Sequence, residues 1–384
     1  MLQICNIMKS PFVYGKIAAG ACFTDRESET ESLVRDFLNL TNTILISPRR
    51  WGKSSLVRKA GEMAKKADPR LRMCYLDIFN VRTEEEFYKK LAVELIRCSA
   101  TKVEEITANA MRFASRLIPS ISAGDPLNKV SISFNLKDFT QTEDDILDMA
   151  EKIAQEKNLN IVVCIDEFQQ IASFADPDAF QARLRSHWQH HQRVAYCLYG
   201  SRRHMMMEVF TNREKPFFQF GKTLFLEKIP REKWPPFIQE KFSESGKTIS
   251  EAQCFRIAEL VEDNPYYIQQ LCEEVWNRTE NTCSDAAISE AFEAIVSGQG
   301  NLNLALTQTL TITQQNLLHA IVNGEKLLSS ATVLDKYGLK NSLTVQRAKN
   351  ALAKMDIIDT FGRTVTMEDP VYAYWLKNIY FGTR

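Results

Sequence analysis

A short apolar strand that runs into a Gly-Lys-Ser sequence at the start of a helix most constrains this fold. Residues 42–47 (NTILIS) form a β-branched run, and a helical pattern extends from Lys53 to Lys66. The connection matches the phosphate-loop pattern GxxxxGK followed by Ser or Thr, except that Ser47 replaces its first Gly. Such a loop turns its backbone N–H groups inward, and the helix N-terminus adds partial positive charge. The spacing therefore predicts a site for phosphate groups.

Three residues of this loop have specific tasks. Gly52 lets the backbone approach the phosphates, Lys53 reaches the β- and γ-phosphates, and Ser54 is a ligand of Mg²⁺. The candidate nucleotide-binding residues of the loop are Ser47, Pro48, Arg49, Arg50, Trp51, Gly52, Lys53, Ser54 and Ser55. The alternative interpretation is a chance Gly-Lys-Ser at a helix start.

Two acids at the end of a second apolar run form the partner motif. Residues 161–165 (IVVCI) are continuously apolar, as in an interior strand of a parallel sheet, and Asp166 and Glu167 follow directly. Asp166 is a candidate Mg²⁺ ligand through water, and Glu167 is a candidate base for the attacking water. A solvated acidic turn is the alternative. The order of the two motifs favours a magnesium–nucleotide site at the carboxyl edge of the sheet.

Polar residues after a later strand complete the candidate catalytic set. The strand at 194–199 (VAYCLY) leads into Gly200 and Ser201, and Ser201 is the candidate sensor of the γ-phosphate. Arg202, Arg203 and Arg213 could each approach that phosphate, from this subunit or a neighbouring one, and Arg213 is the preferred candidate. The predicted catalytic residues are Lys53, Glu167, Ser201 and Arg213.

Strand and helix patterns alternate over residues 1–230, which predicts an α/β core with a parallel sheet. Further strands are expected at 73–78 and 223–226, and a capping box between Thr83 and Glu86 opens a helix after the first of them. Residues 130–136 (VSISFNL) alternate apolar and polar side chains, which predicts a half-buried strand inside an insertion.

Helical patterns replace strands after Pro230 and predict a helical lid over residues 231–300. Its helices are expected at 233–242, 251–261 behind a Ser250/Gln253 capping box, 265–278 and 285–296. The polar segment 297–303 (SGQGNLN) is the expected linker. Over residues 305–384, three helices, a hairpin at 357–367 and a last helix after Asp369-Pro370 predict a winged helix-turn-helix domain.

The composition is that of a compact globular chain. Of 384 residues, 45% are hydrophobic, and 48 basic residues balance 48 acidic ones, which excludes a polybasic or acidic-tailed protein. The nine cysteines include no CxxC pair, so reduced thiols of a cytoplasmic protein are expected. No apolar stretch approaches the roughly 18–20 residues that cross a bilayer, and the N-terminus lacks a signal-peptide core. We therefore expect no membrane partner.

Four runs resemble the AAA-type "archaeal ATPase" family of prokaryotic P-loop ATPases, which is related to the STAND signalling NTPases. These runs are SPRRWGKSSL, VVCIDEFQQI, LYGSRRHMM and DPVYAYWL. The resemblance covers nearly the whole chain and implies a P-loop NTPase sheet, a helical lid and a C-terminal winged helix. It also implies ATP or ADP with Mg²⁺ as ligands, and roles that extend from nucleotide-driven switching to DNA-linked processes.

The same resemblance suggests contacts outside the phosphate loop. Residues 23–27 (FTDRE) resemble the family's FxGRE motif, with Asp25 in place of Gly, and imply that Arg26 lies by the nucleotide base. Phe12 and Tyr14 are implied contacts of the same kind. Residues 263–266 (DNPY) resemble the lid motif GxP, whose proline, Pro265 here, approaches the nucleotide.

Other patterns point less specifically to function. His187, His190 and His191 share a helix face and could form a metal pair, but no nearby Cys or acid in the sequence completes a ligand set, and a solvated helix is the simpler interpretation. In the winged helix, basic residues surround an amphipathic third helix and Arg363 stands at the wing tip, so the domain could dock on DNA. From Leu306 onward nine basic residues face six acidic ones, a weak excess, and winged helices also bind proteins.

Two functions remain open. One is a slow ATPase in which hydrolysis of Mg-ATP drives a switch between core, lid and winged helix, active alone, as a homo-oligomer or with a partner. The other is a nucleotide-bound switch without hydrolysis, whose winged helix docks on DNA or a protein. The intact Asp166-Glu167 pair favours the first, because a pure binding protein has no need of Glu167.

Overall fold

The computed structural model describes residues 9–17, 23–100, 105, 118–123, 130–135, 143–362 and 364–382. Contacts divide the chain into two units. The sheet unit consists of Arg26–Pro48 and Lys53–Glu227. The helical unit consists of the described residues up to Asp25, Arg49–Gly52 and those from Lys228 onward. The phosphate loop thus contributes residues to both units.

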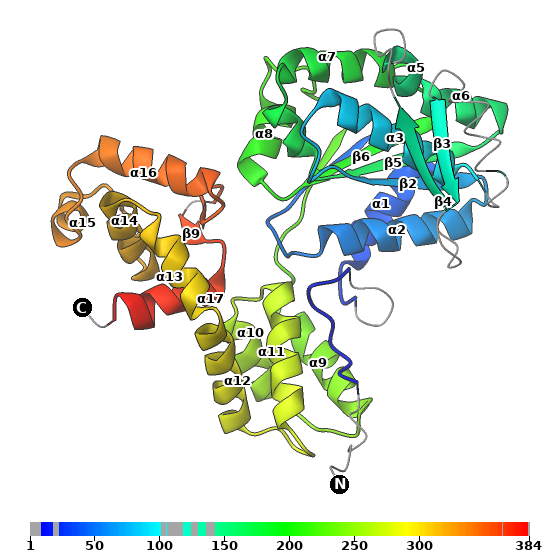
Figure 1. The fold of residues 1–384 in the computed structure, drawn as a ribbon. Helices are drawn as coiled ribbons and strands as arrows, with labels where there is room; N and C mark the ends of the chain where they lie inside the picture. Colours follow the sequence, from blue (N-terminus) through cyan, green and yellow to red (C-terminus); the bar gives the residue numbers. More distant parts are fainter. Residues whose placement is uncertain are drawn as a thin grey trace. The chain divides into compact units, whose positions relative to one another are not determined.

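A five-stranded parallel sheet with strand order β2-β5-β6-β1-β7 forms the centre of the sheet unit (Figure 1). Its strands are β1 (Thr43–Ile46), β2 (Leu71–Asp77), β5 (Asn160–Asp166), β6 (Val194–Gly200) and β7 (Lys222–Phe225). The predicted parallel sheet is confirmed. The register pairs Asp77 with Asp166 and Ile46 with Gly200, so the carboxyl ends of four strands meet at one edge.

Helices between the strands in the sequence complete the sheet unit. They are α1 (Glu27–Leu38), α2 (Lys53–Ala67), α3 (Glu84–Cys98), α5 (Glu143–Leu147), α6 (Met149–Glu156), the 3₁₀ segment η2 (Phe168–Ser173), α7 (Pro177–Trp188) and α8 (Arg203–Thr211). Thr83 caps α3 by accepting the Glu86 N–H, as predicted, although the Glu86 carboxylate accepts from the N–H of Arg82. Aromatic packing stabilises the core, where the rings of Trp188 and Tyr196 stack with centroids 4.0 Å apart.

A separate hairpin lies outside the five-stranded sheet. The strand predicted at 130–136 is β4 (Val130–Asn135), and it pairs antiparallel with β3 (Ile118–Ala123), which the sequence analysis did not anticipate. Leu136 lies outside the described residues.

Four helices of the helical unit form the predicted lid bundle (Figure 1). They are α9 (Trp234–Ser243), preceded by a 3₁₀ turn at Arg231–Lys233 (η3), then α10 (Glu251–Leu260), α11 (Pro265–Arg278) and α12 (Asp285–Gly298). The Ser250/Gln253 capping box of α10 forms in both directions. Asn264 caps α11 through the N–H groups of Tyr266 and Tyr267.

The remaining elements form a winged helix. They are α13 (Gly300–Gln308), α14 (Ile312–Val322), α15 (Ala331–Lys336), α16 (Ser342–Lys354), the hairpin of β8 (Ile358–Asp359) and β9 (Thr366–Met367), α17 (Pro370–Trp375) and a π-helical turn at Leu376–Tyr380 (η4). The predicted hairpin and final helix are present, while Arg363 lies outside the described residues. None of the described helices is long and apolar enough to cross a membrane.

The predicted linker at 297–303 is wrong. Helix α12 continues to Gly298 and α13 begins at Gly300, so the segment is largely helical. Just after this segment, the buried Thr307 hydroxyl of α13 bonds the Asn303 carbonyl at 2.7 Å and the Tyr372 hydroxyl at 2.8 Å. Bundle and winged helix also share a continuous hydrophobic core. A polar, Gly-containing stretch is helical here because tertiary contacts stabilise it.

Candidate phosphate-binding site

The ends of three neighbouring strands bring the predicted site residues together in the sheet unit. Strand β1 leads into the phosphate loop, β5 ends at Asp166, and β6 ends at Gly200 just before Ser201. Because parallel strands place their carboxyl ends at one edge, side chains far apart in the sequence converge there. The loop returns to this edge at Lys53, the first residue of α2.

The Ser54 hydroxyl donates a hydrogen bond to Oδ2 of Asp166 over 2.6 Å. The other carboxylate oxygen of Asp166 accepts the Glu167 N–H at 2.9 Å. Burial raises the pKa of Asp166, although the Lys53 ammonium and the Ser54 hydrogen bond act in the opposite direction. A hydroxyl beside a carboxylate is a donor set that suits Mg²⁺, which prefers oxygen ligands. The two predicted metal ligands therefore fit the ion.

Glu167 accepts contacts from three directions. The buried Lys53 ammonium lies 3.2 Å from its Oε1, the Ser201 hydroxyl donates to its Oε2 at 2.9 Å, and the Gln169 amide donates to the same oxygen. Burial acts to raise the pKa of Glu167, but the Lys53 charge and these hydrogen bonds outweigh it and lower the pKa below its usual value. These contacts therefore favour the ionised form of the carboxylate.

The backbone at Glu167 is strained. Its φ of 56° lies in the left-handed region, where a residue with a side chain is uncommon. Such conformations concentrate at functional sites because surrounding contacts must hold them. Here the turn from β5 into η2 directs the Glu167 side chain toward Lys53 and Ser201.

Gln169 is a site residue that the sequence analysis missed. It is buried, with 3% of its surface exposed, and its amide donates to Glu167. A Cβ at Gly200 would lie 1.8 Å from Gln169 Oε1, so the glycine leaves room for this side chain. The only signal in the sequence is a glutamine two positions after the acid pair, and nothing there distinguishes Gln169 from the neighbouring Gln170.

The start of the phosphate loop explains the departure at Ser47. Its buried hydroxyl donates to the Pro48 carbonyl at 3.0 Å, and Ser47 is not among the positive-φ residues, so the position does not demand glycine. Gly52 does require glycine, because its φ is 86°. No atom lies within 4 Å of a Cβ built at Gly52, which leaves open space at that point of the loop. Ser55 is buried and Trp51 is half-buried.

The two loop arginines belong to the helical unit. Nη2 of Arg49 lies 3.9 Å from Asp356, and Nη1 of Arg50 lies 2.9 Å from the Tyr267 hydroxyl and 3.2 Å from Asp369. The loop pattern predicts that both arginines bind phosphate, whereas here each lies beside an acid of the winged helix.

The two motif positions where Asp replaces the family's Gly both adopt left-handed backbone. Asp25 has a φ of 55° and Asp263 a φ of 59°. Aspartate tolerates this region better than most residues, so neither position requires glycine. Asp263 also accepts a bidentate contact from Arg231, with Nη2 to Oδ2 at 2.8 Å.

The residues beside these motifs are placed as follows. Arg26 immediately precedes α1 and is buried, with 3% of its surface exposed. Its guanidinium forms an ion pair with Glu29 at 2.9 Å. Pro265 is the first residue of α11. Phe12 is buried in the bundle against Phe237 and Phe242, so its ring is part of the core instead of a nucleotide contact. The Tyr14 ring packs edge-on against Tyr266.

The candidate arginine fingers lie at the end of β6 and beyond. Arg202 precedes α8 with Nη1 3.8 Å from Met205 Sδ, and Arg203 is the first residue of α8. Arg213 is exposed in the turn after α8. Within the described residues, no hydrogen bond or ion pair joins Arg213 to Glu167 or Ser201.

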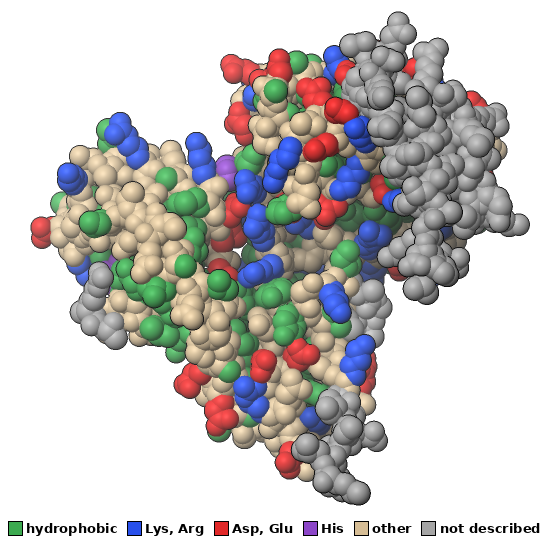
Figure 2. Space-filling view, in the orientation of Figure 1, with side chains coloured by type: hydrophobic (Ala, Val, Ile, Leu, Met, Phe, Trp, Pro, Cys, Tyr) green, Lys and Arg blue, Asp and Glu red, His purple; other side chains and the backbone are tan. Residues whose placement is uncertain are grey.

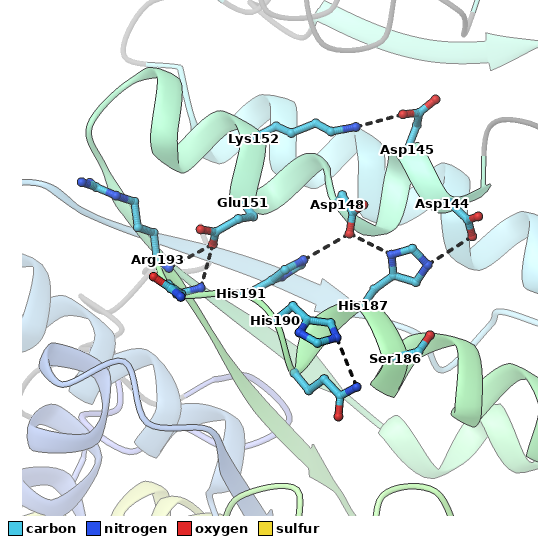
Figure 3. A network of polar contacts seen from close by, with 12 residues as sticks. Asp144, Asp145, Asp148, Glu151, Lys152, Ser186, His187, His190, His191 and Arg193 are labelled. Atoms are coloured by element: carbon cyan, nitrogen blue, oxygen red, sulfur yellow. Dashed lines mark hydrogen bonds and ion pairs between the residues drawn. The ribbon is translucent and has the colours of Figure 1, made fainter.

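The histidine group is part of a polar network and not a simple solvated helix (Figure 3). His187 bonds Asp148 at 2.8 Å and Asp144 at 3.2 Å, and the nearly buried His191 bonds Asp148 at 3.4 Å and the Tyr196 hydroxyl at 2.9 Å. Acids distant in the sequence thus surround these imidazoles. Among the described residues no group of three or more His, Cys, Asp or Glu side chains is arranged to hold a metal ion.

Comparison with known proteins supports the fold assignment. The family described as "Probable winged helix domain" matches residues 304–378. No curated protein matches the chain. The chain is similar in structure to the Walker-type ATPase PABY2304 of Pyrococcus abyssi, with a TM-score of 0.66 at 17% identity over 92% of this chain and 96% of that one.

The ORC2 protein of Aeropyrum pernix is a further structural relative. Its ADP form has a TM-score of 0.53 at 15% identity, covering 96% of both chains. Its ADPNP-ADP complexes have a TM-score of 0.51 at 13% identity, covering 94% of this chain and 96% of that one. At such identities the likeness concerns the fold. This chain therefore has the fold of the P-loop ATPases, with a lid bundle and a C-terminal winged helix.

Proposed function

We propose that this chain binds ATP with Mg²⁺ at residues 47–55 and hydrolyses it slowly, and that hydrolysis drives a switch between core, lid and winged helix. The observation that carries the proposal is the convergence of Lys53, Glu167 and Ser201 from three elements of the sheet edge. A structural ion pair could explain Lys53 and Glu167 alone. It does not explain the additional Ser54–Asp166 pair beside a phosphate loop of the expected spacing.

Each residue has a defined role in this proposal. Lys53 and the loop N–H groups hold the β- and γ-phosphates, and Ser54 and Asp166 would hold the metal. Bound Mg²⁺ supplies charge neutralisation on the phosphate oxygens. Glu167 orients the attacking water and accepts its proton as the bond between the γ-phosphorus and the bridging oxygen breaks. Ser201 senses the γ-phosphate and positions Glu167.

Contacts outside the phosphate loop belong to the proposal as well. Arg26 and Pro265 are assigned to the nucleotide by resemblance, and the left-handed turns at Asp25 and Asp263 support the motif alignment there. Domain limits of 1–230, 231–300 and 305–384 belong to the same proposal, as does a cytoplasmic location.

Turnover is expected to be slow because Arg213, the preferred finger, makes no hydrogen bond or ion pair with Glu167 or Ser201 in the described part of the chain. Arg213 is exposed, in the turn after α8. A neighbouring copy or a partner protein could bring an arginine to the γ-phosphate, which is how such fingers act in related chemistry. We therefore propose a homo-oligomer or a partner complex as the active form, with Arg213 as the finger.

The second candidate function is a nucleotide-bound switch whose winged helix docks on DNA or a protein. Lys340, Arg347 and Lys354 are exposed on and before α16, although Figure 2 shows Lys and Arg side chains spaced apart over α15 and α16. Exposed apolar residues favour a protein partner: Leu302 is 73% exposed and Ile312 76%. Figure 2 shows hydrophobic side chains gathered over the region of α13.

Phosphate release from ATP, with tightly bound nucleotide measured in parallel, tests the proposal. Lys53→Ala is expected to lose nucleotide binding, and Glu167→Gln is expected to retain ATP while turnover falls by about a hundredfold or more, the usual scale for a general base. Lys66→Ala, an exposed lysine at the end of the same helix, is the matched control. Equal turnover in Glu167→Gln contradicts the base assignment. Tight binding without turnover in the wild type favours the second function.

A further inference from the structure

Arg50 of the phosphate loop is held by residues of the lid bundle and the winged helix. Its guanidinium lies 4.5 Å from the centroid of the Tyr266 ring and 5.5 Å from that of Tyr267. Nη1 donates to the Tyr267 hydroxyl at 2.9 Å and to Oδ2 of Asp369 at 3.2 Å. Arg50 has a φ of 66°, a left-handed conformation that must be held by such contacts.

Tyr267 contacts both Arg50 and Asp369, so the three side chains contact one another pairwise. Its hydroxyl accepts the hydrogen bond from Arg50 and donates its own proton to Oδ2 of Asp369 at 2.5 Å. Burial and the neighbouring Asp369 carboxylate raise the pKa of Tyr267, so the hydroxyl keeps its proton and remains a donor. Both bonds of the hydroxyl are therefore satisfied while Arg50 is in place.

The two carboxylate oxygens of Asp369 have different partners. Oδ1 caps α17 by accepting the N–H groups of Val371 and Tyr372, each at 3.0 Å, while Oδ2 faces Arg50 and Tyr267. A change at Oδ2 can thus be made while the helix cap remains. Arg49 and Asp356 form a second, longer pair of the same kind at 3.9 Å. Two successive loop arginines therefore lie beside acids of the winged helix.

The Arg50–Asp369 pair is weak enough to exchange. The Arg50 side chain is 47% exposed and the Asp369 side chain 31%, and ion pairs this open to solvent stabilise a structure only slightly. Arg50 stands three positions before Lys53 in the sequence, inside the motif that recognises phosphate. A di- or triphosphate carries more negative charge than one carboxylate and offers an arginine bidentate oxygens.

We propose that Arg50, Tyr267 and Asp369 form a latch, and that the phosphates of a bound nucleotide compete with Asp369 for Arg50. Asp369 acts as a carboxylate stand-in for phosphate while the loop is empty. Binding of nucleotide withdraws Arg50 and frees the start of α17 from the phosphate loop. The latch rests on the proposed function, because it regulates the proposed nucleotide site. Through it, the contact between the phosphate loop and the winged helix depends on whether nucleotide is bound.

Affinity for ADP, measured by titration calorimetry with Mg²⁺ on the full chain, tests the latch. Asp369→Asn keeps a side-chain oxygen for the α17 cap but loses the charge, and Tyr267→Phe removes only the hydroxyl. Because both remove a competitor, each is expected to tighten ADP binding by roughly two- to fivefold, the scale of an exposed ion pair. The controls Asp335→Asn and Tyr374→Phe, an acid and a tyrosine elsewhere in the winged helix, should match the wild type.

The decisive comparison is whether the effect of Asp369→Asn on ADP affinity requires Arg50. Arg50→Ala should weaken ADP binding, and adding Asp369→Asn to it should then have no effect. Hydrogen exchange gives a second readout: ADP should increase deuterium uptake over residues 368–377 of the wild type, and Asp369→Asn should show that uptake without ADP. Unchanged affinity in Asp369→Asn, or a gain that persists in Arg50→Ala, overturns the latch alone. A wild-type protein that binds no ADP overturns the proposed function and the latch with it.

Discussion

The hydroxyl of Ser54 lies 2.6 Å from Oδ2 of Asp166, which joins the first turn of α2 to the last residue of β5. These two residues are 112 positions apart, and their contact places the phosphate loop and the acid pair at one edge of the sheet. The same edge holds Lys53 against Glu167. The predictions below start from this arrangement.

The Ser54–Asp166 pair predicts metal-dependent nucleotide binding. Replacing Ser54 by Ala should reduce the gain in ATP affinity that Mg²⁺ confers by about tenfold or more, since even outer partners of metal ligands contribute on that scale. Affinity in excess chelator should change little, because the Lys53 contact remains. Calorimetric titration with and without Mg²⁺ measures both, with Ser186→Ala on α7 as control. An unchanged magnesium dependence would remove Ser54 from the metal site.

Gln169 is predicted to position Glu167 for turnover. A hydrogen bond to a charged group contributes about 1.5–3 kcal/mol, so Gln169→Ala should lower kcat by about ten- to hundredfold with little change in KM. Gln170→Ala is the matched control, since its amide bonds the exposed Ser173. Wild-type kcat in Gln169→Ala contradicts the role.

A substitution at Gly200 is expected to displace the Gln169 side chain while Gln169 itself is unchanged. Gly200→Ala places a Cβ within 1.8 Å of Gln169 Oε1 and 2.8 Å of Met206 Sδ, so the amide must move away. We expect the kcat of Gly200→Ala to fall as that of Gln169→Ala does. The kcat of the double variant should be no lower than that of the single variant with the lower kcat. Additive losses would mean that Gly200→Ala acts through general destabilisation, which a thermal melt would detect.

The network around His191 predicts a loss of stability in mild acid. Burial lowers the pKa of His191 below its usual 6.5, against the opposing effects of Asp148 and Glu151. The unfolded chain therefore takes up a proton more readily than the folded one, and the free energy of unfolding should decrease as pH falls below about 6.5.

Asp148 extends this loss to lower pH. Burial acts to raise its pKa, but His187 and His191 lower it from 3.8, so its stabilising contribution disappears as pH falls through that lowered value. Thermal melts between pH 8 and 5 isolate the histidine part. His191→Gln should flatten the decline, whereas His190→Gln, which removes an exposed imidazole, should retain it. Identical slopes in all three proteins would contradict this account.

The winged helix is predicted to bind duplex DNA only weakly, if DNA is its partner. From Leu306 onward the chain carries nine basic and six acidic residues, a net charge of +3, and each neutralised phosphate needs its own cation. Fluorescence anisotropy at low salt should show an affinity that decreases with salt and weakens further in the double variant Arg347→Ala/Lys354→Ala. Lys89→Ala in α3 is the control. The absence of any salt-dependent binding would leave a protein as the partner.

Much of the candidate site could be predicted because its signals are local. The phosphate loop, the acid pair and the caps at Thr83 and Ser250 each depend on residues within a few positions of one another. Strand alternation placed β5 and β6 in one parallel sheet, and a parallel sheet brings their carboxyl ends together. The linker prediction is wrong because polar residues around Gly298 indicate a loop, whereas the segment continues as α12 and α13, with Thr307 of α13 bonded to Asn303 and Tyr372.

The sequence by itself determined which residue types stand in the phosphate-loop and acid-pair patterns, and in what order along the chain. Only the tertiary structure decided which distant side chains meet. Asp369 lies 319 positions from Arg50, and Gln169 shares its space with Gly200 on another strand. Local patterns carry energies that act within a turn or two, whereas these contacts follow from how whole elements pack. No short pattern in the chain encodes them.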